Sequence, residues 1–132
     1  SSNYCVTASV DTVDFLRPIE VGELVVMKAS VNFVGRTSMV VGIRVEAEDI
    51  HSGTIKHCNS SYFTMVAKDD SGKSVPVPGL ILKTEKQVRR FLKSLNRQEM
   101  KKKHRNETSK KTELQIEDLE ILRNSHKVQL EY

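Results

Sequence analysis

Strict alternation of apolar and other residues over positions 31–49 constrains this chain more than any other feature. From Met39 to Ala47 every second residue is apolar, and Val31–Phe33 keeps the same period. A period of two sends successive side chains to opposite faces of a β-strand, so the stretch predicts a hairpin or two adjacent strands with one buried face. The turn between the two segments contains Gly35, which we expect to supply unusual backbone angles.

The same turn contains residues that could bind an anion. Arg36, Thr37 and Ser38 put a fixed cation and two hydroxyl donors at the end of a strand. Such a group suits a phosphate, although an ordinary polar turn has the same composition. Taken alone, the turn leaves both interpretations open.

Further alternating or β-rich segments complete a sheet. With Met39–Asp49, four strands are predicted, the others being Cys5–Phe15, Leu24–Phe33 and Ile55–Lys68. Turn signals separate them at Gly22, at His51–Gly53 and, after the last strand, at Asp69–Lys73. The connections are too short for parallel crossovers, so we expect antiparallel neighbours.

Helical signals follow the sheet after an extended exit. Thr84 with Gln87 three residues later predicts a capping box that starts a helix running to about His104. We expect a break at residues 106–109 and a second short amphipathic helix beyond it. The predicted organisation is a sheet in residues 1–82, a basic helix in 83–105 and a helical tail of unassigned role in 106–132.

Composition excludes several classes of protein. The chain has 132 residues and 38% hydrophobic content, which is enough for one modest core. Cys5 and Cys58 lie outside any metal-ligand or disulfide pattern, so we expect free thiols, a reducing cytoplasm and no metal site. No run of about 18 apolar residues predicts a membrane span. Residues 83–111 hold 12 Lys and Arg against 3 Asp and Glu, but without interleaved aromatic residues they make a weak case for nucleic acid.

The predicted sheet lacks a helix to cover its inner face. No apolar helix precedes the strands or lies between them. The chain also opens at Ser1 without an initiator methionine and passes almost directly into a strand. We therefore expect that the natural protein begins further upstream and that a core helix is missing from this sequence.

Four sequence blocks in order carry a family resemblance. VTASVDTVDFLRPIEVGE, VNFVGRTSMVVGIRVEAED, SSYFTMVAKDDSGKSVPVPGLI and TEKQVRRF resemble the hotdog-fold acyl-CoA thioesterases of the cytosolic acyl-CoA hydrolase type. The resemblance covers residues 4–105. It implies an α+β hotdog fold, in which a curved antiparallel sheet wraps a central helix and is followed here by a C-terminal helical extension.

The resemblance also implies an activity and partners. The family hydrolyses fatty acyl-CoA to a free fatty acid and CoA, needs no cofactor apart from the CoA of its substrate, and forms dimers that often assemble into hexamers. No nucleic acid or membrane partner is implied, and the expected location is cytoplasmic. The catalytic Asp and its partner Asn are expected upstream of this chain.

Supporting site residues can be carried over from the family to this sequence. Thr7 occupies the strand position of a hydroxyl that positions the attacking water, and Ser9 and Asp11 are expected to share its face. The turn that approaches CoA is matched by Gly35, Arg36, Thr37, Ser38 and Met39, with Arg36 as the phosphate partner.

A second class of function stays open from the sequence. The same fold could be a non-catalytic module that binds acyl-CoA or another nucleotide-bearing ligand, or that pairs proteins. An Asp on the core helix with an Asn before it would favour the enzyme, and replacement of both would favour the binding module.

Overall fold

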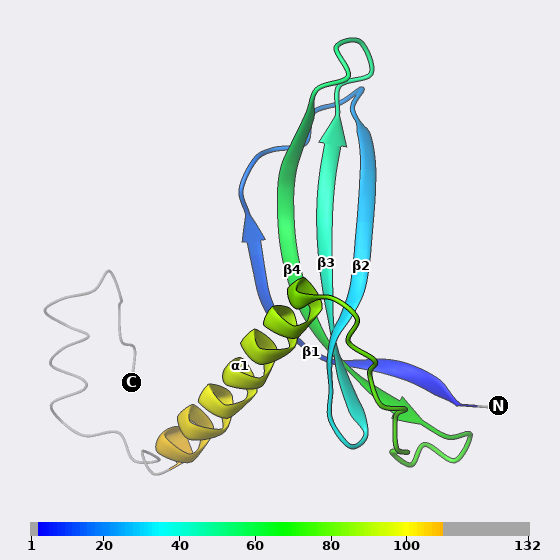
Figure 1. The fold of residues 1–132 in the computed structure, drawn as a ribbon, viewed down its shortest axis with the longest axis vertical. Coiled ribbons are helices and arrows are strands. Elements are labelled where there is room, and N and C mark those ends of the chain that lie inside the picture. Colours follow the sequence, from blue (N-terminus) through cyan, green and yellow to red (C-terminus); the bar gives the residue numbers. More distant parts are fainter. Residues whose placement is uncertain (1–2, 110–132) are drawn as a thin grey trace, which may run out of the picture. The chain divides into compact units, whose positions relative to one another are not determined.

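A four-stranded antiparallel sheet followed by one helix makes up the part of the chain that the structure describes (Figure 1). The structure is a computed structural model, and it describes residues 3–109. Its elements are β1 (Tyr4–Phe15), β2 (Leu24–Val34), β3 (Ser38–Glu48), β4 (Ile55–Lys68) and α1 (Glu85–Ser109). The chain divides after Leu95 into two units, and the sheet and the first turns of α1 lie in the first unit.

All four predicted strands are confirmed, each within one residue of its expected ends. The turns predicted around Gly22 and Gly53 are also present, with positive φ angles of 95° and 70° that favour glycine. Cys5 and Cys58 are both free thiols, as expected. Within residues 3–109, no helix is long and apolar enough to cross a membrane.

The order of the strands corrects one expectation. The sheet runs β1-β4-β3-β2, so β1 and β2 lie at opposite edges although a short link joins them. Pro18 excludes a tight hairpin there, and the eight residues from 16 to 23 can reach about 26 Å, which exceeds the roughly 14 Å across three strand spacings. The short link therefore crosses the sheet and does not pair its two strands.

Polar contacts hold this crossing link against β4. The amide of Leu16 donates to the Cys58 carbonyl at 2.9 Å, and Lys56 Nζ lies 2.9 Å from the Glu23 carboxylate. The backbone N–H of Glu20 also donates to the Glu23 carboxylate at 2.8 Å. This N–H first, and Lys56 second, lower the pKa of Glu23, so the carboxylate stays ionised and keeps the link in place.

Cross-strand pairing assigns each side chain to one of two faces. One, here called the apolar face, carries mostly hydrophobic residues: Val10, Val13, Phe15, Val25, Met27, Val31, Met39, Val41, Ile43, Val45, Phe63 and Met65. The other, called the mixed face, carries Lys28, Ser30, Phe33, Ser38, Arg44, Glu46, Ser60, Tyr62 and Thr64. The alternation of the sequence thus becomes a division between two chemically different surfaces.

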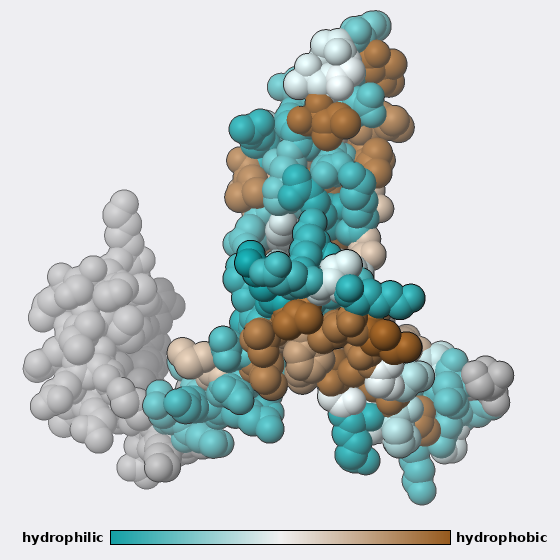
Figure 2. Space-filling view, viewed as in Figure 1, coloured by the Kyte–Doolittle hydropathy of each residue, from teal (hydrophilic) through white to brown (hydrophobic). Residues whose placement is uncertain are grey.

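The first turns of α1 contact the mixed face, and the apolar face is exposed. The rings of Phe33 and Phe91 lie 4.9 Å apart between centroids. Figure 2 shows hydrophobic residues gathered where the first turns of α1 meet the sheet, with hydrophilic residues over most of the strands above. On the apolar face, Met27 is 67% exposed and Phe15 is 83% exposed. Such exposure of large apolar side chains marks a surface built for burial.

The start of α1 follows the predicted capping box. Thr84 N donates to Gln87 Oε1 and Gln87 N donates to Thr84 Oγ1, both at 3.2 Å. The end of the helix differs from the expectation, because α1 continues through Ser109, past His104 and through the predicted break. Asn, Glu, Thr and Ser lower helix propensity by only some tenths of a kcal/mol each, and the segment holds no Gly or Pro to stop it. The predicted second helix lies outside the described residues.

Replacing Thr84 should weaken this helix start. Thr84→Ala removes the acceptor for the Gln87 amide and should cost about 1 kcal/mol of unfolding free energy, measured by urea titration. Thr84→Ser keeps the acceptor and serves as the control. Equal losses in the two variants would show that the capping bond does not stabilise the protein.

Candidate functional site

A cross-strand row on the apolar face links two of the predicted site residues. Thr7 pairs with Met65, and Met65 pairs on its other side with Met39. The Thr7 hydroxyl lies 3.3 Å from the Met65 sulfur, a weak acceptor. Because a thioether does not hold a hydroxyl strongly, Thr7 is an exposed donor that a bound molecule could engage.

Two β-bulges in β1 overturn the expectation that Thr7, Ser9 and Asp11 share a face. The register shifts between Thr7 and Ser9 and again between Val10 and Thr12. Thr7 pairs with Met65 but Ser9 pairs with Thr64, its neighbour on β4. Since adjacent β4 residues point to opposite faces, Ser9 lies on the mixed face.

A hydrogen-bonded cluster explains the polar residues of β1. Ser9 Oγ donates to Asp11 Oδ1 and Thr64 Oγ1 donates to Asp11 Oδ2, both at 2.8 Å. These bonds tie the bulged strand to β4 on the mixed face. Ser9 and Asp11 therefore bond to each other and to Thr64, away from the face that carries Thr7.

The turn between β2 and β3 is held by its backbone. Gly35 N donates to Ser38 O at 2.8 Å, and the Arg36 and Thr37 carbonyls accept bonds from Val77 N and Ala67 N at 2.9 and 3.0 Å. Contrary to expectation, Gly35 does not have a positive φ angle. A Cβ there would lie 3.1 Å from Ser38 Oγ, a close approach to the end of a rotatable side chain.

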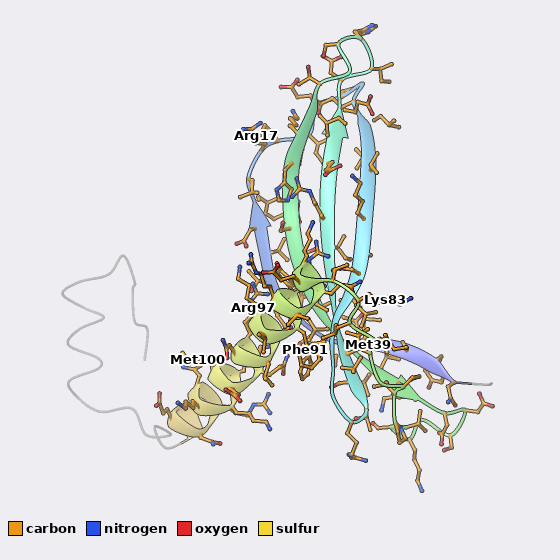
Figure 3. All side chains as sticks on the ribbon, in the orientation of Figure 1. Arg17, Met39, Lys83, Phe91, Arg97 and Met100 are labelled. Carbon is orange, nitrogen blue, oxygen red and sulfur yellow. The ribbon has the colours of Figure 1, made fainter. Side chains whose placement is uncertain are left out.

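The turn presents its side chains at the same end of the sheet as Thr7. Arg36 is exposed, and its guanidinium has no carboxylate partner within residues 3–107. Ser38 pairs with Val66 on the mixed face, one position along from the Met39–Met65 pair. Figure 3 shows Met39 and Phe91 at this end. The structure thus brings together Thr7, Met39 and the turn, and separates Ser9 from them.

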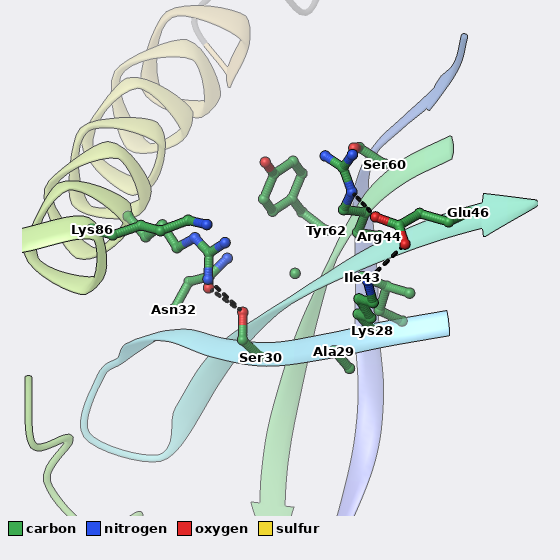
Figure 4. Close-up of a pocket in the computed structure, with 12 residues that line it drawn as sticks. Lys28, Ala29, Ser30, Asn32, Ile43, Arg44, Glu46, Ser60, Tyr62 and Lys86 are labelled. Carbon is green, nitrogen blue, oxygen red and sulfur yellow. Dashed lines mark hydrogen bonds and ion pairs between the residues drawn. The ribbon is translucent and has the colours of Figure 1, made fainter. Parts of the chain in front are cut away.

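Sequence reasoning missed a charged hollow on the mixed face (Figure 4). It measures about 580 Å³, and Asn32 and Gly42 lie among its lining residues. Asn32 is a bulged residue, unpaired between Val31 and Phe33, and only 6% exposed. Asn32 occupies the polar position of the alternation between Val31 and Phe33, so the sequence held no signal for the bulge.

Comparison with known proteins identifies the family. Residues 1–54 match the model of the Thioesterase superfamily. Protein VdlD of Helicobacter pylori is 50% identical over 105 residues, covering 76% of this chain and 60% of that protein. The uncharacterized acyl-CoA thioester hydrolase YkhA of Bacillus subtilis is 41% identical, covering 63% and 48%. The human cytosolic acyl coenzyme A thioester hydrolase is 33% identical, covering 65% and 23%.

Solved structures agree in fold. A hexameric acyl-CoA thioesterase in its apo form is 39% identical with a TM-score of 0.73, over 76% of this chain and 64% of that one. An acyl-CoA hydrolase of Staphylococcus aureus with an Asn-to-Ala replacement, in complex with coenzyme A, is 31% identical with a TM-score of 0.72, over 92% of this chain and 68% of that one. The chain belongs to the hotdog-fold acyl-CoA thioesterases. Further structures of the S. aureus hydrolase carry an Asp-to-Ala or a Thr-to-Ala replacement.

Membership of this thioesterase family confirms the predicted α+β hotdog fold. The four described strands supply its antiparallel sheet, and α1 follows them as the C-terminal helical extension. The chain spans 60% of the length of its H. pylori relative and 64% of the hexameric thioesterase chain.

Proposed function

We propose that the protein hydrolyses fatty acyl-CoA to a free fatty acid and CoA. The observation that carries this proposal is the match of 92% of the chain to a solved acyl-CoA hydrolase in complex with coenzyme A. Three features fit acyl-CoA hydrolysis. They are the order of the four strands, the hydroxyl of Thr7 on the apolar face and the cation of Arg36 in the β2–β3 turn.

The reaction needs an activated water and donors aimed at the oxyanion. A base takes one proton from water as its oxygen attacks the thioester carbonyl, the C–S bond then breaks, and the CoA thiolate takes up a proton. We assign Thr7 to positioning that water. The base, an Asp, and its partner Asn are assigned to a segment outside this sequence. The Asp, Asn and Thr replacements made in the S. aureus hydrolase support this choice of residue types.

The β2–β3 turn is proposed to receive the CoA portion of the substrate. Arg36 would pair with a phosphate, because a guanidinium without a carboxylate partner among the described residues matches phosphate geometry. Gly35, Thr37, Ser38 and Met39 would shape the approach to the row that contains Thr7, and Ser9 would act only by holding Asp11.

Further properties of the whole protein follow from the same relatives. We propose self-association as a dimer and a hexamer, supported by the hexameric thioesterase structure. A cytoplasmic location is supported by the cytosolic human relative, and CoA enters only as part of the substrate, without another cofactor. The division into residues 1–82, 83–105 and 106–132 is kept as a proposed organisation.

Thiol release from a series of fatty acyl-CoAs by the full-length protein tests the activity and the placement of Thr7. Thr7→Ala should lower kcat about tenfold or more, because one hydrogen bond to the reacting water is lost. Ser9→Ala removes the same type of group two residues away but on the mixed face, and kcat should stay within about twofold.

Either of two results would contradict the proposal. Absence of thiol release from every acyl-CoA despite binding would leave a non-catalytic module. Equal loss of kcat in the two variants would show that Thr7 acts through the structure of β1.

Removing the cation of the turn should affect substrate binding more than turnover. Arg36→Gln should raise KM for acyl-CoA roughly three- to tenfold and leave kcat nearly unchanged, since an exposed ion pair is screened by solvent. Arg17→Gln removes a similar exposed cation from the link between β1 and β2 and should leave KM as it is. The same KM change in both variants would assign the effect to net charge.

A further inference from the structure

The hollow on the mixed face gathers cations from three elements. Lys28 comes from β2, Arg44 from β3, and Lys86 and Arg90 from the first turns of α1. Among the residues that the structure describes, Glu46 is the one acidic residue in its lining. Four basic side chains against one carboxylate leave a net positive charge around a space of about 580 Å³, within the range of small-molecule pockets.

The one carboxylate is already neutralised by two of these cations. Lys28 Nζ and Arg44 Nε each lie 2.7 Å from a Glu46 oxygen (Figure 4). The Lys28 bond first, and the Arg44 bond second, lower the pKa of Glu46, which therefore stays ionised. The two cations at the helix have no such partner. Within the described residues no carboxylate pairs with Lys86 or Arg90, and Arg90 makes only a long contact of 3.5 Å to Ser30 Oγ.

A buried amide donor also opens toward the hollow. The Asn32 side chain accepts a 2.8 Å bond from Ser30 Oγ through Oδ1, whereas its Nδ2 has no acceptor among residues 3–107. No buried polar atom of the described side chains is both enclosed and unbonded, so Nδ2 keeps access to the open space. Asn32 as a whole residue is 6% exposed, and its Nδ2 is a donor that a molecule in the hollow can reach.

Gly42 makes the position of this amide possible. A Cβ at Gly42 would lie 2.4 Å from Asn32 Nδ2, closer than any contact allows. The bulge at Asn32 turns its side chain across the neighbouring strand, and Gly42, the cross-strand partner of Ser30, leaves the room for it. The bulge at Asn32 and the glycine at position 42 together place the Asn32 Nδ2 donor at the floor of the hollow.

We propose that this hollow is a binding site for a phosphate-bearing anion, separate from the face that carries Thr7. Arg90 and Lys86 supply the charged donors, and Asn32, held by the bond from Ser30 to its Oδ1, supplies a neutral donor below them. The ring of Tyr62 stands at the side of the hollow and could contact an organic part of the ligand (Figure 4). The chemistry recognised is the phosphate group, whether it is free or carried by a nucleotide or CoA.

Calorimetric titration of the full-length protein tests this site. The compounds titrated are inorganic phosphate, pyrophosphate, adenosine 5′-monophosphate and coenzyme A, with uncharged adenosine as the blank. We expect saturable binding of at least one of the phosphate compounds and none of adenosine alone. Arg90→Gln should weaken that binding about tenfold or more. The matched control Lys93→Gln removes an exposed cation of the same helix that does not line the hollow, and should weaken binding less than twofold.

A second variant, Asn32→Asp, has a side chain of nearly equal size but replaces the amide donor with a carboxylate. It should abolish binding. The melting temperature of the variant is measured separately, as a control for folding. Tight binding of coenzyme A alone would assign the site to the substrate's own phosphates, and binding of phosphate or pyrophosphate would assign it to the phosphate group itself. Absence of saturable binding for all four compounds, or equal weakening by Arg90→Gln and Lys93→Gln, would overturn the proposal.

Discussion

The register of the sheet is the constraint on which the rest of this structure depends. In a β-sheet a slip of one residue moves every later side chain to the other face. Bulges in β1, β2 and β4 make such slips locally, while the pairing on either side of each bulge is kept. Through them the chain sends Thr7 to the apolar face and Ser9 to the mixed face, and turns Asn32 toward the hollow.

This division gives each face a separate role. The apolar face exposes Val10, Met27 and Phe15 among others, and such surface gains free energy when it is covered, at about 25 cal/mol per Å². The mixed face already carries the first turns of α1 through the Phe33–Phe91 contact. Placing the proposed hydrolysis on one face and the proposed phosphate site on the other follows from this arrangement. The expectation that a core helix from outside this sequence covers the apolar face stays a prediction.

Local signals predicted the elements well, and tertiary pairing explains most of the errors. The alternation around Val41 and the Thr84 capping box depend on neighbours in sequence, and both were confirmed. β1 is separated from β2 because it pairs with β4 instead. No pattern within β1 or within β2 reveals this pairing. The sequence predicts an end for α1 near His104, but the weak helix formers after it do not stop the helix, which continues through Ser109.

Side-chain direction was the hardest property to predict from sequence. Thr7, Ser9 and Asp11 share a face only if β1 is regular, and bulges have no reliable signature in a single sequence. The sequence predicts unusual backbone angles at Gly35, whereas its φ angle is not positive in the structure. The hollow escaped prediction because Lys86 and Arg90 lie far in sequence from Asn32 and meet it only after α1 packs on the sheet.

Nuclear Overhauser contacts from β1 to the Phe63 ring test the central claim most directly. With the bulge between Thr7 and Ser9, Val10 is the residue paired with Phe63, so its methyl groups should show strong contacts to that ring. A regular β1 would pair Ser9 with Phe63 instead. Strong Val10 contacts and none from the Ser9 β-protons are the predicted result. Strong Ser9 contacts to the Phe63 ring would contradict the account and return Ser9 to the face of Thr7.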